Sequence, residues 1–430
     1  MRMKNNRLLL GLSAALMGLV FTTPEAQATP AFARQMEMNC LSCHTQAITT
    51  LNSFGRQFKL SGFSMTKGGK SMITGGDLGM SLPLAINAGA GVKSNYVSYS
   101  EDNVARDNLS TPAGTAIMIG GKVAENAGAH TLWSGDGVVH MQTTFTQPLG
   151  AGRAGLSIFG SQGHGPFIAT ESYNTGLHKE LSIFDNGKNT NAAQATGLGM
   201  GPASGLTAFY GGYGLTVTGG LWAKGFNTTF NNQGLDVDGS HSSLYRVSYD
   251  LPMLAGWEFS LGAFGLNGST TGTPNKLFEN TGAQFLTTPW ASQLTTFHTK
   301  AHGFDLQTLG SLAGMQSQLA VMHVGNWEYK MTDYLTGAAR GPAQDAKATS
   351  VEGRLMVVPK FGVSAGYMSY SNNPISGVAV TAPGYKTRTL GLLYNYADNV
   401  RFSVEQSNID SDAASAATYK VTMLQAIIVL

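Results

Sequence analysis

The pattern of hydrophobic and polar positions changes once along the chain, near residue 75. Beyond that point apolar and polar residues alternate in short segments, clearly at residues 215–222 and less cleanly at residues 244–249. In residues 401–405 the charged side chains fall on one face and the apolar side chains on the other. A period of two is typical of β-strands with one apolar and one polar face. The sequence therefore predicts a mainly β fold from residue 75 to residue 430.

The connections between the predicted strands alternate between short and long. Short turns are expected at residues 148–151, 211–213, 359–360 and 397–399, and long polar stretches near residues 99–114, 161–204, 267–296, 329–349 and 371–386. This alternation is typical of an outer-membrane antiparallel β-barrel, in which the long loops face the outside. At roughly 20–24 residues per strand and connection, the barrel should hold about 16 strands. Residues 419–430 form a plausible closing strand that pairs with the first strand.

Composition supports a barrel over an ordinary globular domain. Charged residues make up 12% of the chain, about half the usual share, and glycine accounts for 55 of 430 residues. After the first 28 residues no run of 18 apolar residues occurs, which disfavours membrane-spanning helices. Aromatic residues near strand ends either form interfacial girdles or are ordinary strand residues; they are Tyr249, Trp257, Trp327, Tyr329, Tyr394 and Tyr396.

The first 28 residues have the features of an export signal. A basic start is followed by an apolar stretch at residues 8–21 and by Ala26-Gln27-Ala28, which fits a cleavage site. The alternative is an uncleaved membrane anchor. Without this segment the basic residues fall from 27 to 24 and the acidic residues from 25 to 24, because it holds three Lys/Arg and one Glu. A net charge near zero gives no reason to expect a nucleic-acid partner.

The strongest chemical motif is Cys40-Leu41-Ser42-Cys43-His44, which contains both cysteines of the chain. A C-x-x-C-H run allows two thiols to attach one haem c covalently while the histidine binds its iron. A disulfide between the two cysteines would need a strained loop, and zinc would need further ligands. We therefore expect an electron carrier with Cys40 and Cys43 as attachment sites and His44 as axial ligand. No catalytic residue is expected beyond the haem.

Residues 29–74 are expected to form a small helical cytochrome domain and a linker. Apolar residues at spacings of three and four predict an amphipathic helix over residues 47–60. The distal haem ligand is open: Met65 is the first candidate, and Met36, Met38, Met72 or a barrel histidine such as His298 or His302 are alternatives. Arg34, Arg56 and Lys59 either pair with haem propionates or are solvated.

One family resemblance rests on the segment around this motif. The runs Pro30-Ala31-Phe32-Ala33-Arg34-Gln35, Cys40-x-x-Cys43-His44 and Leu51-Asn52-Ser53-Phe54-Gly55-Arg56-x-Phe58-Lys59-x-x-Gly62-Phe63 resemble the fused monohaem cytochrome c–porins of iron-oxidising bacteria. In that family a haem domain precedes an outer-membrane barrel and is thought to plug it. The motif match covers residues 30–63. Met36 and Glu37 replace the Thr-Gly that the family often has, and Phe63 stands where it often has Tyr.

The resemblance implies an outer-membrane protein that oxidises extracellular Fe(II) and reduces a periplasmic c-type cytochrome. It also implies a haem within reach of the outer face. The acidic residues Glu171, Glu180 and Asp185, in an expected outer loop, are either an iron-docking cluster or simply solvated. Two further hypotheses remain: a diffusion porin with an accessory cytochrome, and a soluble periplasmic cytochrome fused to a β domain. The predicted organisation is a signal peptide (1–28), a cytochrome domain with its linker (29–74) and a porin-like barrel (75–430) in contact with outer-membrane lipid.

Overall fold

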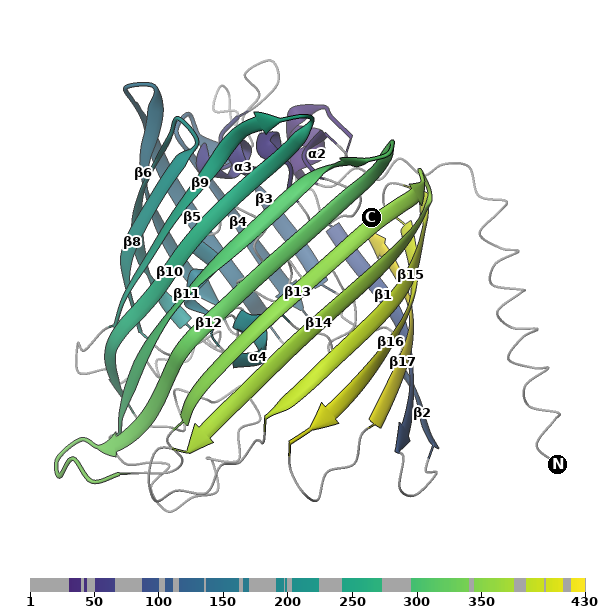
Figure 1. Ribbon diagram of the computed structural model, residues 1–430. Coiled ribbons are helices and arrows are strands. Elements are labelled where there is room, and N and C mark those ends of the chain that lie inside the picture. Colours follow the sequence, from purple (N-terminus) through teal and green to yellow (C-terminus); the bar gives the residue numbers. More distant parts are fainter. Residues whose placement is uncertain are drawn as a thin grey trace, which may run out of the picture.

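The computed structural model is dominated by one antiparallel β-sheet that closes into a barrel (Figure 1). It describes residues 31–39, 42–44, 51–65, 87–99, 105–110, 116–134, 137–161, 165–169, 191–196, 198, 203–223, 242–272, 295–339, 344–374, 384–397, 400–412 and 419–429. The helices are α2 (Ala31–Met36), α3 (Ser53–Leu60) and α4 (Ala192–Thr196), with a 3₁₀ turn η3 (Pro166–Ala169). The strands are β1 (Asn87–Tyr99), β2 (Ala105–Ser110), β3 (Ala116–Ala124), β4 (Ala127–Ser134), β5 (Gly137–Leu149), β6 (Gly152–Ser161), β7 (Ala203–Gly212), β8 (Leu215–Ala223), β9 (Ser242–Leu254), β10 (Trp257–Gly272), β11 (Thr295–Leu312), β12 (Met315–Asp333), β13 (Gln344–Val358), β14 (Phe361–Pro374), β15 (Tyr385–Ala397), β16 (Val400–Ser411) and β17 (Tyr419–Val429).

The prediction of 16 strands is confirmed once β2 and β3 are considered together. Within the described residues the sheet has 17 segments. However, β1 pairs with β2 from Ser98↔Ala105 and with β3 from Gly89↔Ala116, so the two segments are halves of one interrupted strand. The expected closing strand is also confirmed, because β17 pairs with β1 antiparallel along its whole length. Closure leaves no sheet edge exposed.

The two faces of the barrel wall have opposite character. On β15 and β16 most of the buried residues that face inward are polar, namely Thr387, Thr389, Arg401, Ser403, Glu405 and Ser407; Gly391, Leu393 and Ile409 are the others. The residues between them face outward and include Leu390, Leu392 and Val404, all exposed. The same alternation on β5, β6, β9 and β11 exposes large apolar side chains such as Phe145, Ile158, Tyr245 and Phe304. An outward apolar band around a polar interior is the arrangement that a lipid environment requires.

Most of the short turns lie at one end of the barrel; among the described strand pairs the exception is the two-residue connection of β4 and β5, where Ser134 pairs with Gly137 at the opposite end. Three of them, Tyr213-Gly214, Ala255-Gly256 and Ala313-Gly314, have positive φ at both central residues. These are the left-handed turns that match the twist of a two-residue hairpin. Glycine at the second position is therefore required there. The expected turn at residues 211–213 is displaced, because Gly211 and Gly212 still belong to β7.

Several stretches expected as long loops contain regular structure. Strand β2 lies within residues 99–114, β10 continues to Gly272, and β12 continues to Asp333. The wall therefore extends further at the long-loop end than the sequence indicated. Among the expected girdle residues, Tyr249 and Tyr394 are exposed on the outer face near short turns. The side chains of Trp327 and Tyr329 lie outside the described residues.

The described parts of the connection between β6 and β7, residues 165–169, 191–196 and 198, lie inside the barrel. Helix α4 packs against the inner wall formed by β12, β13 and β14, and Figure 1 shows it between the ribbons of the barrel. Its Ala192 nitrogen donates a hydrogen bond to the Ser350 hydroxyl (3.0 Å). Phe167 of η3 packs on Phe264 of β10, with 5.6 Å between ring centroids. These residues belong to an apolar core inside the barrel that also includes Ala193, Leu198, Leu266, Met322, Val324, Ala346, Ala348 and Met368.

In the part of the chain that the structure describes, no helix has the length and apolar character needed to cross a bilayer.

Candidate functional site

Helix α3 begins later than the sequence indicated, and its start shapes the site. The predicted helix over residues 47–60 is wrong at Leu51 and Asn52, because Leu51 forms a β-bridge with His44 and Asn52 caps the helix. The Asn52 Oδ1 atom accepts a hydrogen bond from the Gly55 amide (3.0 Å). Asparagine is among the preferred residues at this position, since it satisfies an amide that the helix cannot. Residues 47–50 of the prediction lie outside the described residues.

The second half of the C-x-x-C-H motif is fixed to the start of α3. The Asn52 amide donates to the Cys43 carbonyl (2.9 Å), and the Asn52 side-chain amide donates to the Ser42 carbonyl (3.0 Å). Gly55 approaches the same turn so closely that a Cβ atom there would collide with the Cys43 carbonyl oxygen. The turn and the helix are thus one packed unit. Cys40, the other expected attachment site, lies outside the described residues.

The described part of this unit fits a covalent haem. It presents a thiol and an imidazole on consecutive residues, Cys43 and His44, and both are half-buried. Leu51, which forms a β-bridge with His44, and Phe54, which packs on the neighbouring hydrophobic cluster, are apolar and also half-buried. This donor set, at the edge of an apolar surface, is what haem c attachment needs. The close approach of Gly55 keeps the turn against that surface.

An aromatic cluster forms the core of the segment. Phe32 of α2 stacks on Phe63 (5.2 Å between centroids) and meets Phe58 of α3 edge-on (5.2 Å). Met36 is buried in this cluster, and Met65 packs on its edge. The Gln35 side chain donates to the Phe63 carbonyl (2.7 Å) and to the Met65 carbonyl (2.6 Å), which joins α2 to the residues after α3.

The aromatic cluster contains or contacts two of the methionines considered as distal haem ligands, Met36 and Met65. Met36 packs in the core, Met38 is exposed, and Met72 lies outside the described residues. Met65 is half-buried at the edge of the cluster, so its place as the first candidate stays a prediction.

The barrel histidines divide into two sets. His298 and His302 alternate on β11 with buried inward residues, so they share a face, but that face is the outside of the barrel toward the long loops. The prediction that either could reach the haem is therefore wrong. His130 and His140 face inward, with their Nε2 atoms 2.7 Å apart, and Phe63 meets His130 edge-on (4.9 Å). No motif in the sequence singles out this pair, although the alternation of strands β4 and β5 places both residues on inward positions.

An ion pair joins α3 to the barrel. The Arg56 guanidinium lies 3.3 Å from the Asp250 carboxylate of β9 and 3.1 Å from the Glu258 carboxylate of β10. Ser260 donates a hydrogen bond to Asp250 from the same wall. Arg56 is only 3% exposed, so its guanidinium is shielded from water, whereas the two carboxylates stay partly exposed. Arg56, expected as a solvated residue or a propionate partner, thus binds barrel carboxylates that the sequence had not linked to it.

The other contacts place the segment inside one mouth of the barrel. The Lys122 amide of β3 donates to the Gln35 side chain (2.9 Å), and Leu60 packs against Gly211 of β7. Gly62 packs with its carbonyl against Gly128 of β4. Each of these wall residues lies near a short turn, and Figure 1 shows α2 and α3 at that end. Cys43 and His44 are therefore at the short-turn end, whereas the family resemblance implied a haem within reach of the outer face.

The acidic residues Glu171, Glu180 and Asp185 lie outside the described residues. The described parts of the same connection, η3 and α4, turn into the barrel and are buried there. The expectation that residues 161–204 form an outer loop throughout is thus wrong for these parts.

Comparison with known proteins identifies the fold and no family. No family model matches the chain, and no curated protein matches its sequence. Among solved structures, OprB of Pseudomonas putida is 11% identical with a TM-score of 0.51, over 80% of this chain and 93% of that chain. A loop L8 deletion mutant of OmpT from Vibrio cholerae is 13% identical with a TM-score of 0.48, over 80% and 98%. OmpF of Salmonella typhi, in a complex with daunomycin, is 12% identical with a TM-score of 0.42, over 80% and 97%. The likeness to OprB supports the closed-barrel fold.

Proposed function

We propose that the chain is an outer-membrane c-type cytochrome–porin that oxidises extracellular Fe(II) and passes the electrons to a periplasmic c-type cytochrome. Each Fe(II) becomes Fe(III) and releases one electron, which reduces one acceptor haem, as in an iron:cytochrome c oxidoreductase. The proposed mature chain begins at Thr29, after export, with residues 29–74 as the cytochrome domain and residues 75–430 as the barrel.

The observation that carries this proposal is the position of the Cys43–His44 turn. It is packed on α3, and α3 is joined by Arg56 to the short-turn mouth of a closed barrel. In outer-membrane barrels the short turns face the periplasm. A redox centre at this mouth would be accessible to a periplasmic electron acceptor.

The residues of the segment have separable tasks in this proposal. When bound, a haem c attached through Cys40 and Cys43 with His44 as axial ligand supplies a one-electron redox centre. Asn52 and Gly55 position the turn that carries Cys43 and His44. Leu51 pairs with His44 through a β-bridge and covers that side of the turn. Arg56 holds the whole unit in the mouth.

The electron donor has to approach through the barrel. The long-loop end is separated from the Cys43–His44 turn by about the thickness of a bilayer core, roughly 30 Å. The inner wall between the two ends carries the carboxylates of Glu352 and Glu405 among polar residues, whereas the Asp305 carboxylate is paired with Arg246 (2.8 Å). Carboxylate oxygens suit hard divalent cations. We therefore expect hydrated Fe(II) to enter from the long-loop side, and bulky iron chelates to react more slowly.

Two features of the wall favour this function over the two alternatives. A general diffusion porin needs a wide lumen, whereas η3 and α4 occupy part of the barrel interior and form an apolar core with the inner wall. In a soluble β domain, an outward band of exposed apolar residues such as Leu390, Leu392 and Phe304 would face water, which is unfavourable.

The test uses the full-length holoprotein in vesicles, with a c-type cytochrome enclosed as acceptor. Fe(II) added outside should reduce the protein's haem, seen in its α-band, and then the enclosed cytochrome. A Cys43→Ala variant that inserts in the vesicles but lacks intact haem attachment is the control and should transfer no electrons. If Fe(II) leaves the haem of the intact protein oxidised, the iron-oxidase function is excluded. If the haem is reduced but the enclosed cytochrome is not, the inward route is excluded.

A further inference from the structure

The outer face of β11 to β15 carries a row of lysines at the long-loop end of the apolar band. On β11 the outward residues run from Phe304 through His302 to Lys300. On β13 the outward residues change from the apolar Val351 to Lys347, and on β15 they change from Leu390 to Lys386. Together with Lys330 on β12, these side chains define a basic rim of Lys300, Lys330, Lys347 and Lys386, all of them exposed.

The basic rim has few internal counter-charges. Glu328 lies opposite Lys300 across the strand pair, and Asp345 lies opposite Glu328. Even so, none of the four lysines has a carboxylate within ion-pair distance in the described part of the chain. Arg388, next to the rim, differs in this respect because it pairs with Asp410 (3.4 Å). Four ammonium groups beside a lipid-facing surface therefore remain available to an external anion.

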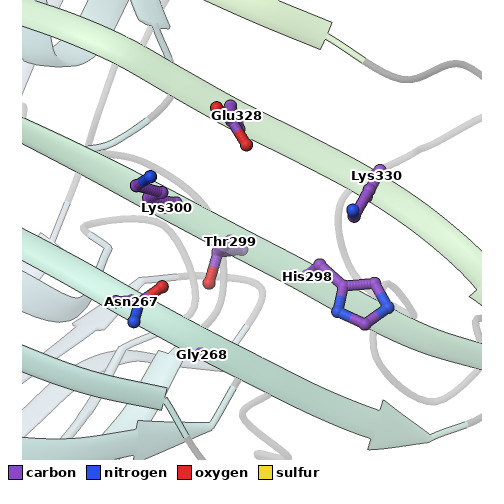
Figure 2. Close-up of a pocket in the computed structure, with 7 residues that line it drawn as sticks. All are labelled: Asn267, Gly268, His298, Thr299, Lys300, Glu328 and Lys330. Carbon is purple, nitrogen blue, oxygen red and sulfur yellow. The ribbon is translucent and has the colours of Figure 1, made fainter. Parts of the chain in front are cut away.

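The wall is hollowed at one end of the rim. A cavity of about 180 Å³ lies over β10, β11 and β12, and Figure 2 shows its lining side chains. Lys300, Lys330 and His298 line it together with Asn267, Gly268, Thr299 and Glu328. The His298 ring is oriented by a hydrogen bond with the Thr332 hydroxyl (3.0 Å). The cavity thus offers cationic and hydrogen-bonding groups directly above apolar wall.

We propose that the basic rim binds the headgroup phosphates of an anionic phosphoglycolipid in the outer leaflet of the surrounding membrane. The apolar wall below would contact the acyl chains, and the lysines would reach the phosphates at the headgroup level. Lysine side chains at membrane interfaces extend their charged ends toward the headgroups in this way. The inference goes beyond the proposed electron transfer and rests only on the barrel's place in an outer membrane.

The test is lipid binding by the full-length holoprotein in phosphatidylcholine nanodiscs, with diphosphorylated lipid A as the probe. Lys300→Gln/Lys330→Gln and Lys347→Gln/Lys386→Gln should each weaken binding roughly tenfold or more, since every lysine near an anionic headgroup contributes. The control, Lys360→Gln, removes an exposed lysine at the short-turn end and should bind like the unchanged protein. Barrel folding is checked by β-sheet circular dichroism, and single variants replace any pair that fails to fold.

Three results would overturn the proposal. Both rim variants could bind lipid A as tightly as the control. Lipid A without its phosphates could bind equally well, which would leave only an apolar contact. Inorganic phosphate at millimolar concentration could displace the lipid completely, which would mark a site for small anions. Electron transfer from Fe(II), measured on the same variants, should be unchanged, so a failure here is distinct from a failure of the proposed function.

Discussion

Arg56 is the residue on which the position of the N-terminal segment depends most directly. Its guanidinium forms ion pairs with the carboxylates of Asp250 and Glu258, which belong to neighbouring strands of the wall. Because Arg56 is buried, removing its charge would leave the two carboxylates facing each other without a cation. Breaking a fully buried ion pair costs about 3–5 kcal/mol. The carboxylate side chains are 26% and 24% exposed, so water moderates the loss here.

Arg56→Met should therefore loosen the segment without unfolding the barrel. We expect a cost of about 2 kcal/mol for docking, between the values for exposed and buried pairs. Hydrogen exchange in residues 51–65 should then be about 30-fold faster, since 1.4 kcal/mol corresponds to a factor of about ten. The control is Arg388→Gln, which breaks an ion pair whose side chains are 65% and 39% exposed. Equal exchange rates in the two variants would show that the Arg56 contact does not hold the segment.

At the scale of the element, α3 depends on Asn52 for two separate contacts. Its Oδ1 atom caps the helix through the Gly55 amide, and its side-chain nitrogen donates to the Ser42 carbonyl in the C-x-x-C-H turn. One side chain thus couples the start of the helix to the presentation of Cys43 and His44. The two contacts can be separated, because aspartate retains the acceptor and lacks the donor.

Asn52→Ala should destabilise α3 by about 1 kcal/mol, the usual cost of losing an N-cap. Asn52→Asp should retain the helix and lose only the bond to Ser42. We expect faster hydrogen exchange of the Gly55 amide in the alanine variant alone, and a lower ratio of covalent haem to protein in both variants. If exchange at Gly55 is the same in Asn52→Ala and the unchanged protein, the side chain does not stabilise the helix as a cap.

Sequence patterns identified the elements better than their ends. Strands such as β8 and β16 follow from alternation alone, because one face meets lipid and the other meets polar groups. The turns at Ala255-Gly256 and Ala313-Gly314 were overlooked, because alanine gives no signal for the positive φ that it adopts there. Helix α3 begins at Ser53 because the polar side chain of Asn52 ends the helical pattern that Ile48 and Leu51 would otherwise extend.

At the scale of the whole molecule, composition and loop lengths predicted the closed barrel, but not what lies inside it. The position of the N-terminal segment depends on contacts between distant residues, such as Arg56 with Asp250, that no local pattern reveals. Helix α4 has only five residues, and its burial depends on an inner wall that is locally apolar at Phe264, Leu266 and Met322. Inward apolar residues are unusual for a polar lumen, so they indicate a partner inside the barrel.

The packing of α4 leads to an expectation about conductance. A 16-stranded barrel without inserted segments leaves an aqueous channel. Here Ala192 and Ala193 are fully buried between α4 and the inner wall, where an unpaired carboxylate would be costly by several kcal/mol. Ala192→Asp should therefore displace α4 and raise the conductance of the full-length protein in planar bilayers.

The control is Ala313→Asp, which lies in an exposed turn. Ala313 has a left-handed backbone conformation that aspartate also tolerates, so this variant should leave the conductance low. If Ala192→Asp makes the connection accessible to protease while the conductance stays at the control level, α4 does not limit passage, and the N-terminal segment at the other mouth would be the remaining barrier.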